Sequence, residues 1–135
     1  MPATALVATK TVVVADDTAF VRDRFRTALT GAGHRVITLR TGTDLLGYVR
    51  DEHNDIDLVV LDLRLPQARG IDLVRTIRSY SSFTAPIVVF SGTIANADEV
   101  RELATLGVTG YVNEYTAVQH IVPSLAPHLF PDQYN

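Results

Sequence analysis

The stretch DLVVLD, residues 57–62, sets the expectation for the whole architecture. Its four central residues are apolar without interruption, with two β-branched valines in the middle. A continuous apolar run of this kind is typical of a central strand that helices cover on both faces of a parallel sheet. Asp62 follows the last apolar residue, at the carboxyl end of the run. The stretch therefore predicts a buried parallel strand with an acid at the sheet edge where such folds bind ligands.

Four other short apolar runs flank this strand in the sequence and alternate with helical patterns. They are TVVVAD (11–16), RVITLR (35–40), PIVVFS (86–91) and GYVN (110–113). Between and after the runs, apolar residues recur at helical spacing within 20–29, 45–49, 71–77, 100–104 and 118–129. This alternation predicts an α/β fold with five βα units, in which helices flank one layer of parallel sheet.

The composition predicts one compact domain, because 135 residues that are 47% hydrophobic can bury a sizeable core. A net charge of -3 argues against direct binding of nucleic acid, and the lack of cysteine suits a cytoplasmic setting. We find no signal peptide pattern and no apolar run near the roughly 20 residues of a membrane helix. We expect a flexible arm over 1–9, the domain over 10–129, and a tail or linker start over 130–135.

Acidic and hydroxyl side chains follow three of the predicted strands. Asp16 and Asp17 end the first run, Asp62 the third and Ser91 the fourth. Three aspartates at one sheet edge repel each other unless a cation joins them, and carboxylate oxygens suit Mg²⁺. An aspartate beside such a metal can attack a phosphoryl group and form an acyl phosphate. The spacing alone supports an acidic metal site and only suggests phosphoryl transfer.

Each of these residues also has an ordinary structural interpretation. An Asp-Asp pair after a strand is often the N-cap of the next helix. Asp62 could be a lone loop acid, and Ser91 a capping hydroxyl. Their joint placement at the ends of three strands favours a functional site over three unrelated caps.

Four passages together resemble the receiver domain of bacterial two-component response regulators, over residues 10–129. They are VVVADDTAFVR, DLVVLDLRLPQARG, PIVVFSG and GVTGYVNEY. The resemblance implies a flavodoxin-like (βα)5 fold with strand order 2-1-3-4-5. It also implies that Asp62 accepts a phosphoryl group from a sensor histidine kinase or a phosphotransfer protein. Such a domain is a signalling switch whose chemistry acts only on itself, and not an enzyme in the usual sense.

The resemblance further implies a role for the residues around Asp62. Mg²⁺ would be held by Asp16, Asp17, Asp62 and the backbone carbonyl of Arg64. Ser91 matches the switch hydroxyl, Gly92 the small residue after it, and Tyr111 the aromatic residue that changes rotamer on activation. A downstream output domain or effector protein would read the switch.

Glu114 departs from the family, which has a lysine at this position, and Tyr115 replaces a proline that usually adopts the cis form. A charge pair at about 4 Å and an effective dielectric of 20 contributes about 4 kcal/mol before desolvation. Glu114 could turn outward, or it could face the site with Arg64 as a substitute cation. Alternatively, the chain is a degenerate receiver that acts as a phosphorylation-independent protein interaction module.

Pro123 is a second departure, because a proline two turns into the last helix should kink or shorten it. In the family, the face formed by the fourth helix, the fifth strand and the fifth helix often mediates dimerisation or output contacts. A homodimer through this face is one option, but Tyr115 and a bent last helix would both alter it.

Overall fold

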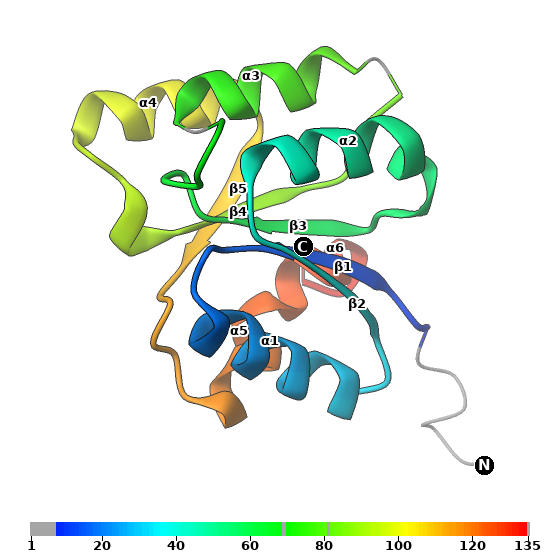
Figure 1. Cartoon of the computed structure of the whole chain (residues 1–135). Helices are drawn as coiled ribbons and strands as arrows, with labels where there is room; N and C mark the ends of the chain where they lie inside the picture. Colours follow the sequence, from blue (N-terminus) through cyan, green and yellow to red (C-terminus); the bar gives the residue numbers. More distant parts are fainter. Residues whose placement is uncertain (1–7, 69, 81, 135) are drawn as a thin grey trace.

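The computed structural model describes residues 8–68, 70–80 and 82–134, and strands alternate with helices along the chain (Figure 1). The strands are β1 (Thr11–Ala15), β2 (Arg35–Leu39), β3 (Leu58–Leu61), β4 (Ile87–Phe90) and β5 (Val108–Val112). All neighbours pair in parallel, in the order β2-β1-β3-β4-β5. The expected sheet of a flavodoxin-like fold is therefore confirmed, strand order included.

Helices cover both faces of the sheet. They are α1 (Ala19–Gly31), α2 (Gly42–Glu52), α3 (Ile71–Ser79), α4 (Ala97–Thr105), α5 (Val118–Leu129) and α6 (Pro131–Tyr134), with short 3-10 turns η2 (His53–Asp55) and η3 (Ser91–Thr93). Figure 1 shows α2, α3 and α4 on one face, and α1 and α5 on the other. Among the described residues, no helix combines the length and the apolarity that crossing a membrane requires.

The alternation of side chains along each strand divides the core into two layers. Val13 and Ala15 of β1 belong to the layer under α2, α3 and α4, whereas Val12 and Val14 belong to the layer with α1 and α5. All four residues of β3 and all four of β4 are buried. The continuous apolar run in DLVVLD is explained by this double cover, as a central parallel strand requires.

The fifth strand starts at Val108, two residues before the predicted start at residue 110. The pairing of β4 with β5 is irregular, because Ile87 pairs with Val108 but the next residue, Val88, pairs with Gly110. Thr109 is therefore the extra residue of a bulge, which re-aims the end of the strand. Thr109 and Gly110 interrupt the apolar pattern, so the sequence does not indicate that the strand begins at Val108.

Pro123 was predicted to kink or shorten the last helix, and the shortening is wrong. The helix α5 continues through Pro123 and Pro127 to Leu129. Its buried face, made by Ile121, Leu125 and Leu129, packs into the core layer shared with α1. This apolar contact keeps the helix in place although each proline lacks a backbone donor.

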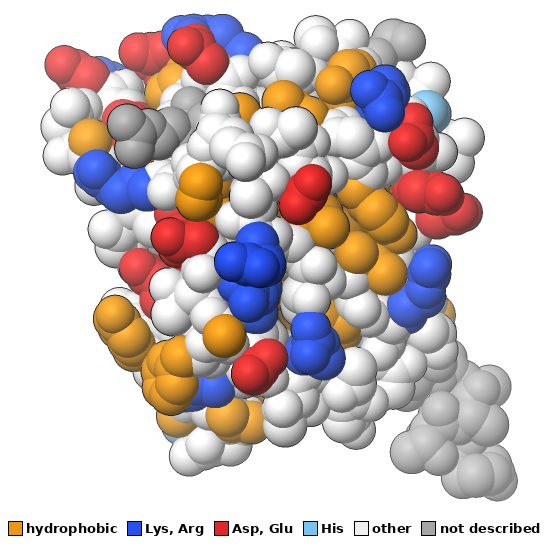
Figure 2. All heavy atoms as spheres, in the orientation of Figure 1, with side chains coloured by type: hydrophobic (Ala, Val, Ile, Leu, Met, Phe, Trp, Pro, Cys, Tyr) orange, Lys and Arg blue, Asp and Glu red, His pale blue; other side chains and the backbone are white. Residues whose placement is uncertain are grey.

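Charged side chains of both signs are interspersed on the face of the molecule that Figure 2 shows. Neither sign forms a continuous field there, in keeping with a net charge of only -3. Without a positive field, this face does not favour binding of a polyanion such as nucleic acid.

Candidate functional site

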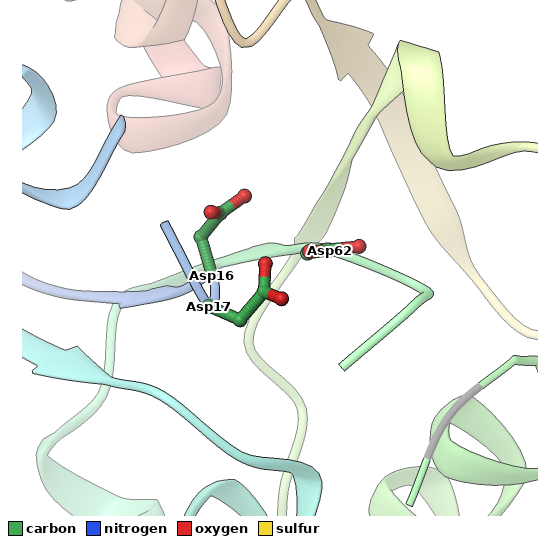
Figure 3. Close-up of side chains that lie close together, drawn as sticks. All are labelled: Asp16, Asp17 and Asp62. Carbon is green, nitrogen blue, oxygen red and sulfur yellow. The ribbon is translucent and has the colours of Figure 1, made fainter. Parts of the chain in front are cut away.

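Three aspartates meet at the carboxyl edge of the sheet. Ala15 of β1 pairs with Leu61 of β3, so the next residues, Asp16 and Asp62, emerge side by side. The backbone N–H of Asp62 donates to the carbonyl of Ala15 at 2.9 Å and fixes this register. Carboxylate oxygens of Asp16, Asp17 and Asp62 all lie within 4.8 Å of one another (Figure 3). The predicted convergence of the strand ends is therefore present.

Backbone donors hold the two buried carboxylates of this cluster in place. Asp16 is 3% exposed, and its Oδ1 accepts a hydrogen bond of 2.8 Å from the N–H of Thr18. Asp62 is 4% exposed, and its Oδ1 accepts one of 2.7 Å from the N–H of Arg64. Asp17, by contrast, is exposed to solvent. The cluster thus combines two fixed, buried acids with one acid at the rim.

The acids of the cluster disfavour each other's charge. Burial raises the pKa of Asp16 to about 6, and the nearby charges of Asp62 and Asp17 act in the same direction. The pKa of Asp62 is also raised, first by burial and then by the charges of Asp17 and Glu114. Backbone hydrogen bonds to both carboxylates oppose these effects only in part. An acidic site of this kind gains stability when a cation neutralises it.

The donor set of the cluster fits Mg²⁺. It offers carboxylate oxygens from three residues, close enough together to contact one ion. Mg²⁺ takes oxygen ligands and keeps several of its waters, so a few carboxylates on one side suffice. The expected acidic site is thus formed in the fold, and it is typical of the magnesium site of a receiver domain.

The loop after β4 carries one residue that the sequence identified and one that it missed. Ser91 is half-buried and starts the short turn η3 directly after the strand. Thr93, which the sequence did not single out, is buried, and its hydroxyl donates to the carbonyl of Phe90 at 2.7 Å. The same hydroxyl accepts from the N–H of Leu63 at 3.1 Å, and so ties this loop to the residue after Asp62. Nothing in the sequence FSGT indicates that the hydroxyl of Thr93 connects the loops after β3 and β4.

Glu114 lies over the loop that follows β4. Its Oε1 accepts a hydrogen bond of 3.0 Å from the backbone N–H of Gly92, and the side chain is half-buried. Its charge reaches the cluster, since it contributes to the raised pKa of Asp62. The structure therefore does not have the outward-turned Glu114 that was one of the predicted alternatives.

Arg64 does not act as the substitute cation in this structure. Its Nε donates to the carbonyl of Thr93 at 3.2 Å, so the guanidinium is engaged by the backbone of the loop after β4. The ion pairs found among the described residues do not include one between Arg64 and Glu114. Within the part of the chain that the structure describes, Arg64 therefore supplies no cation paired with Glu114 beside Asp62.

The turn that carries Glu114 is fixed by residues that the sequence did not indicate. Asn113 closes the turn, with its carbonyl accepting from the N–H of Thr116 at 3.1 Å and its Oδ1 from that of Tyr115 at 2.7 Å. Arg24 of α1 donates to the carbonyl of Glu114 at 3.2 Å and also to that of Thr116. This hydrogen bond joins two residues that lie 90 positions apart in the chain, so local sequence patterns cannot reveal it.

The two aromatic residues near this turn are on the surface. Tyr111 on β5 is 42% exposed, and Tyr115 in the turn is 72% exposed. An exposed tyrosine at position 111 has room to change rotamer. Its predicted part in a switch stays a prediction.

Comparison with known proteins identifies relatives over most of the chain. A model of the family "response regulator receiver domain" matches residues 12–125. The transcriptional regulatory protein KdpE of Mycobacterium tuberculosis is 35% identical over 103 residues, which are 76% of this chain and 43% of KdpE. The polar-differentiation response regulator DivK of Brucella ovis is 22% identical over 122 residues, which are 90% of this chain and 97% of DivK. The chain thus spans less than half of KdpE but nearly all of DivK.

Solved structures share the fold. The chemotaxis response regulator CheY4 of Vibrio cholerae superposes with a TM-score of 0.79 at 22% identity, over 90% of this chain and 100% of that one. The phosphorylated cyanobacterial phytochrome response regulator RcpA superposes with a TM-score of 0.78 at 25% identity, over 92% of this chain and 96% of that one. Both have the sheet and helix arrangement described above.

Proposed function

The chain belongs to the response regulator receiver domains, and from this premise we propose that Asp62 accepts a phosphoryl group in a Mg²⁺-dependent reaction. The observation that carries the proposal is the position of Asp62, buried at the end of a central strand with two further carboxylates within 4.8 Å. The domain is a signalling module, and its own chemistry is limited to gaining and losing this group. Ser91 and Tyr111 would respond to the group as switch residues.

The geometry of Asp62 distinguishes its two oxygens. Oδ1 already accepts the N–H of Arg64, so Oδ2 is the atom we assign as the nucleophile. In the transfer, an Oδ2–P bond forms, the N–P bond of a phosphohistidine breaks, and the imidazole nitrogen recovers the bonding pair and a proton. Water later cleaves the acyl phosphate, which returns the carboxylate and releases inorganic phosphate.

Mg²⁺ would be held by Asp16, Asp17, Asp62 and the backbone carbonyl of Arg64. When bound, it supplies positive charge that neutralises the carboxylates and the phosphoryl oxygens. Arg22 supports this set from α1, because its Nη1 donates to the carbonyl of Asp16 at 2.8 Å and steadies the chain next to Asp17.

The phosphoryl donor in this proposal is a sensor histidine kinase or a phosphotransfer protein, and the exchange takes place in the cytoplasm. KdpE is a transcriptional regulatory protein of which the matched region covers 43%, whereas DivK is matched over nearly its full length. Both architectures, with an attached output domain or with a separate effector protein, are compatible with the proposal. Gene context or the full-length chain decides between them.

The test is phosphorylation of Asp62 by a small phosphodonor. Acetyl phosphate with Mg²⁺ should add one phosphoryl mass to the wild type, measured by intact-mass spectrometry, and none to Asp62→Asn. The acyl phosphate hydrolyses, so beryllofluoride serves in parallel as a stable mimic, monitored by NMR at Ser91 and Tyr111. An unmodified wild-type mass together with unchanged NMR spectra would refute the proposal.

Glu114 gives specific support to a second candidate function, a protein interaction module that works without phosphorylation. An anion already lies on the Gly92 N–H, and the resemblance implies a lysine at this position. The beryllofluoride experiment separates the two candidates, because the interaction module predicts no response at Asp62.

A further inference from the structure

The hydrogen bond between Glu114 and Gly92 joins the two loops that border the cluster on the β4 and β5 side. Gly92 lies in the turn after β4, and Glu114 in the turn after β5. We call this contact, from Glu114 Oε1 to the Gly92 N–H at 3.0 Å, the Glu114 latch. A backbone N–H that donates to a carboxylate is a donor suited to anions.

Two features prepare the latch. Asn113 and Arg24 fix the backbone of the turn around Glu114, so only the side chain must be ordered to make the contact. Gly92 leaves the space that the carboxylate fills, since a Cβ at this position would lie 2.3 Å from Oε2 and 3.0 Å from Oε1. An alanine there would push the carboxylate away, at little cost to the fold, because the atoms it meets are the far end of a flexible side chain.

The charge of the latch opposes the charge of a phosphorylated site. A phosphoryl group carries about two negative charges. Leu61 of β3 pairs with Val89 of β4, and Phe90 of β4 pairs with Val112 of β5. Asp62 and the turn that carries Glu114 therefore leave the sheet at the same edge, on either side of β4, and the charge of Glu114 acts on Asp62. Because like charges at close range repel, a phosphoryl group on Asp62 and the latched carboxylate cannot both be favourable.

We propose that Glu114 is an internal competitor of the phosphoryl group: its carboxylate occupies the Gly92 N–H in the unmodified protein and is displaced when Asp62 is phosphorylated. This inference rests on the proposed phosphoacceptor function. Displacement uncouples the turn after β5 from the loop after β4, the two segments that the latch joins. No covalent bond changes in this step; a carboxylate leaves a backbone donor and turns to water. The residue thereby sets a threshold for activation.

The test is a double-mutant cycle with beryllofluoride as the probe. Wild type, Gly92→Ala, Glu114→Ala and the double variant are titrated with beryllofluoride at fixed Mg²⁺, and binding is followed by NMR. Gly92→Ala removes the contact and keeps the charge, whereas Glu114→Ala removes both. Each single variant should bind beryllofluoride on the order of three- to tenfold more tightly than wild type. The double variant should gain little beyond Glu114→Ala, because no latch is left to break.

A ligand-free spectrum gives an independent readout. The amide proton resonance of Gly92 should move in Glu114→Ala before any probe is added, and move less in Glu114→Gln, whose amide oxygen can still accept the bond. Unchanged affinity in both single variants, weaker binding in them, or fully additive effects would overturn the latch. The absence of beryllofluoride binding by all four proteins would instead refute the phosphoacceptor function on which the latch rests.

Discussion

The β1–β3 edge and the β5 end of the same site differ in how they follow the receiver family. At the β1–β3 edge, Asp16, Asp17 and Asp62 lie within 4.8 Å of each other, in the pattern that the resemblance implies. At the β5 end, the carboxylate of Glu114 accepts the N–H of Gly92, at a position where the resemblance implies a lysine. The acidic cluster at the β1–β3 edge can therefore be retained while the charge at the β5 end changes sign. We infer that cation binding and stabilisation of the phosphoryl group are separable properties in this domain.

The largest expected effect concerns the cluster of Asp16, Asp17 and Asp62 alone. Magnesium at a hundredfold excess over its dissociation constant should stabilise the fold by about 2.7 kcal/mol, because it binds only the folded chain. Asp16→Asn should abolish this gain. The same variant should raise the melting temperature of the metal-free protein, because it removes a buried carboxylate that burial and Asp62 disfavour. Thermal denaturation with and without Mg²⁺ measures both changes.

The control for this experiment is Asp55→Asn, an exposed acid outside the cluster, which should respond to Mg²⁺ as the wild type does. NaCl at matched ionic strength corrects for general salt effects. If MgCl₂ raises the melting temperature of the wild type no more than NaCl does, the three aspartates do not form a metal site.

Two glycine substitutions sharpen the comparison at the level of packing. A Cβ on Gly42, the first residue of α2, would lie 1.9 Å from the backbone oxygen of Ala68, in the loop after β3. A Cβ on Gly92 meets only the carboxylate tip of Glu114. Gly42→Ala should destabilise the protein by about 1–3 kcal/mol in urea denaturation, because backbone must move. Gly92→Ala should change the free energy of unfolding by much less, and equal losses would show that the latch is as rigid as the β3 loop.

The sequence was sufficient to predict the acidic cluster and insufficient for the β5 end, for a physical reason. Runs such as DLVVLD indicate central parallel strands, and the acids that follow them must then meet at one edge. The direction of the Glu114 side chain depends instead on the Asn113 turn and on hydrogen bonds from Arg24, ninety residues away in the chain.

The same limit applies to the other features that the sequence left out. Thr93 gains its role from a bond to the N–H of Leu63, a contact between two loops. Pro123 was expected to kink or shorten α5, but the buried face that includes Ile121 lets the helix continue to Leu129. In each case a tertiary contact, which no local pattern contains, determines the outcome.

A smaller effect is expected from reversing the charge at the β5 end. Glu114→Lys should tighten beryllofluoride binding by about tenfold, because a change of two charge units at a half-exposed position is worth on the order of 1–2 kcal/mol. Magnesium affinity of the unphosphorylated form should fall, since a cation replaces an anion near the cluster. Glu114→Gln should shift both quantities in the same directions by less. If both variants bind both ligands as the wild type does, the two halves are not coupled and Glu114 does not act on the site.

The smallest effect lies at the other end of β1, and it separates the pH response of the fold from that of the site. His34 is buried, its Nδ1 accepts the backbone N–H of Lys10 at 3.1 Å, and its ring packs beside Phe130. Burial lowers the pKa of His34 below its usual 6.5, the charge of Lys10 acts in the same direction, and Asp57 opposes both.

Below pH 6.5 the unfolded chain therefore takes up the proton more readily than the folded chain, and stability falls as the pH drops from 6.5 towards the lower folded pKa. His34→Gln, which keeps an acceptor for Lys10, should remove this loss, so that the variant loses less stability than the wild type as the pH drops from 7.5 to 5.5, whereas His120→Gln at an exposed position should behave as the wild type does. The measurement is urea denaturation at each pH without Mg²⁺. A slope for His34→Gln equal to that of the wild type would show that the acids of the cluster, and not this histidine, govern the pH response in that window.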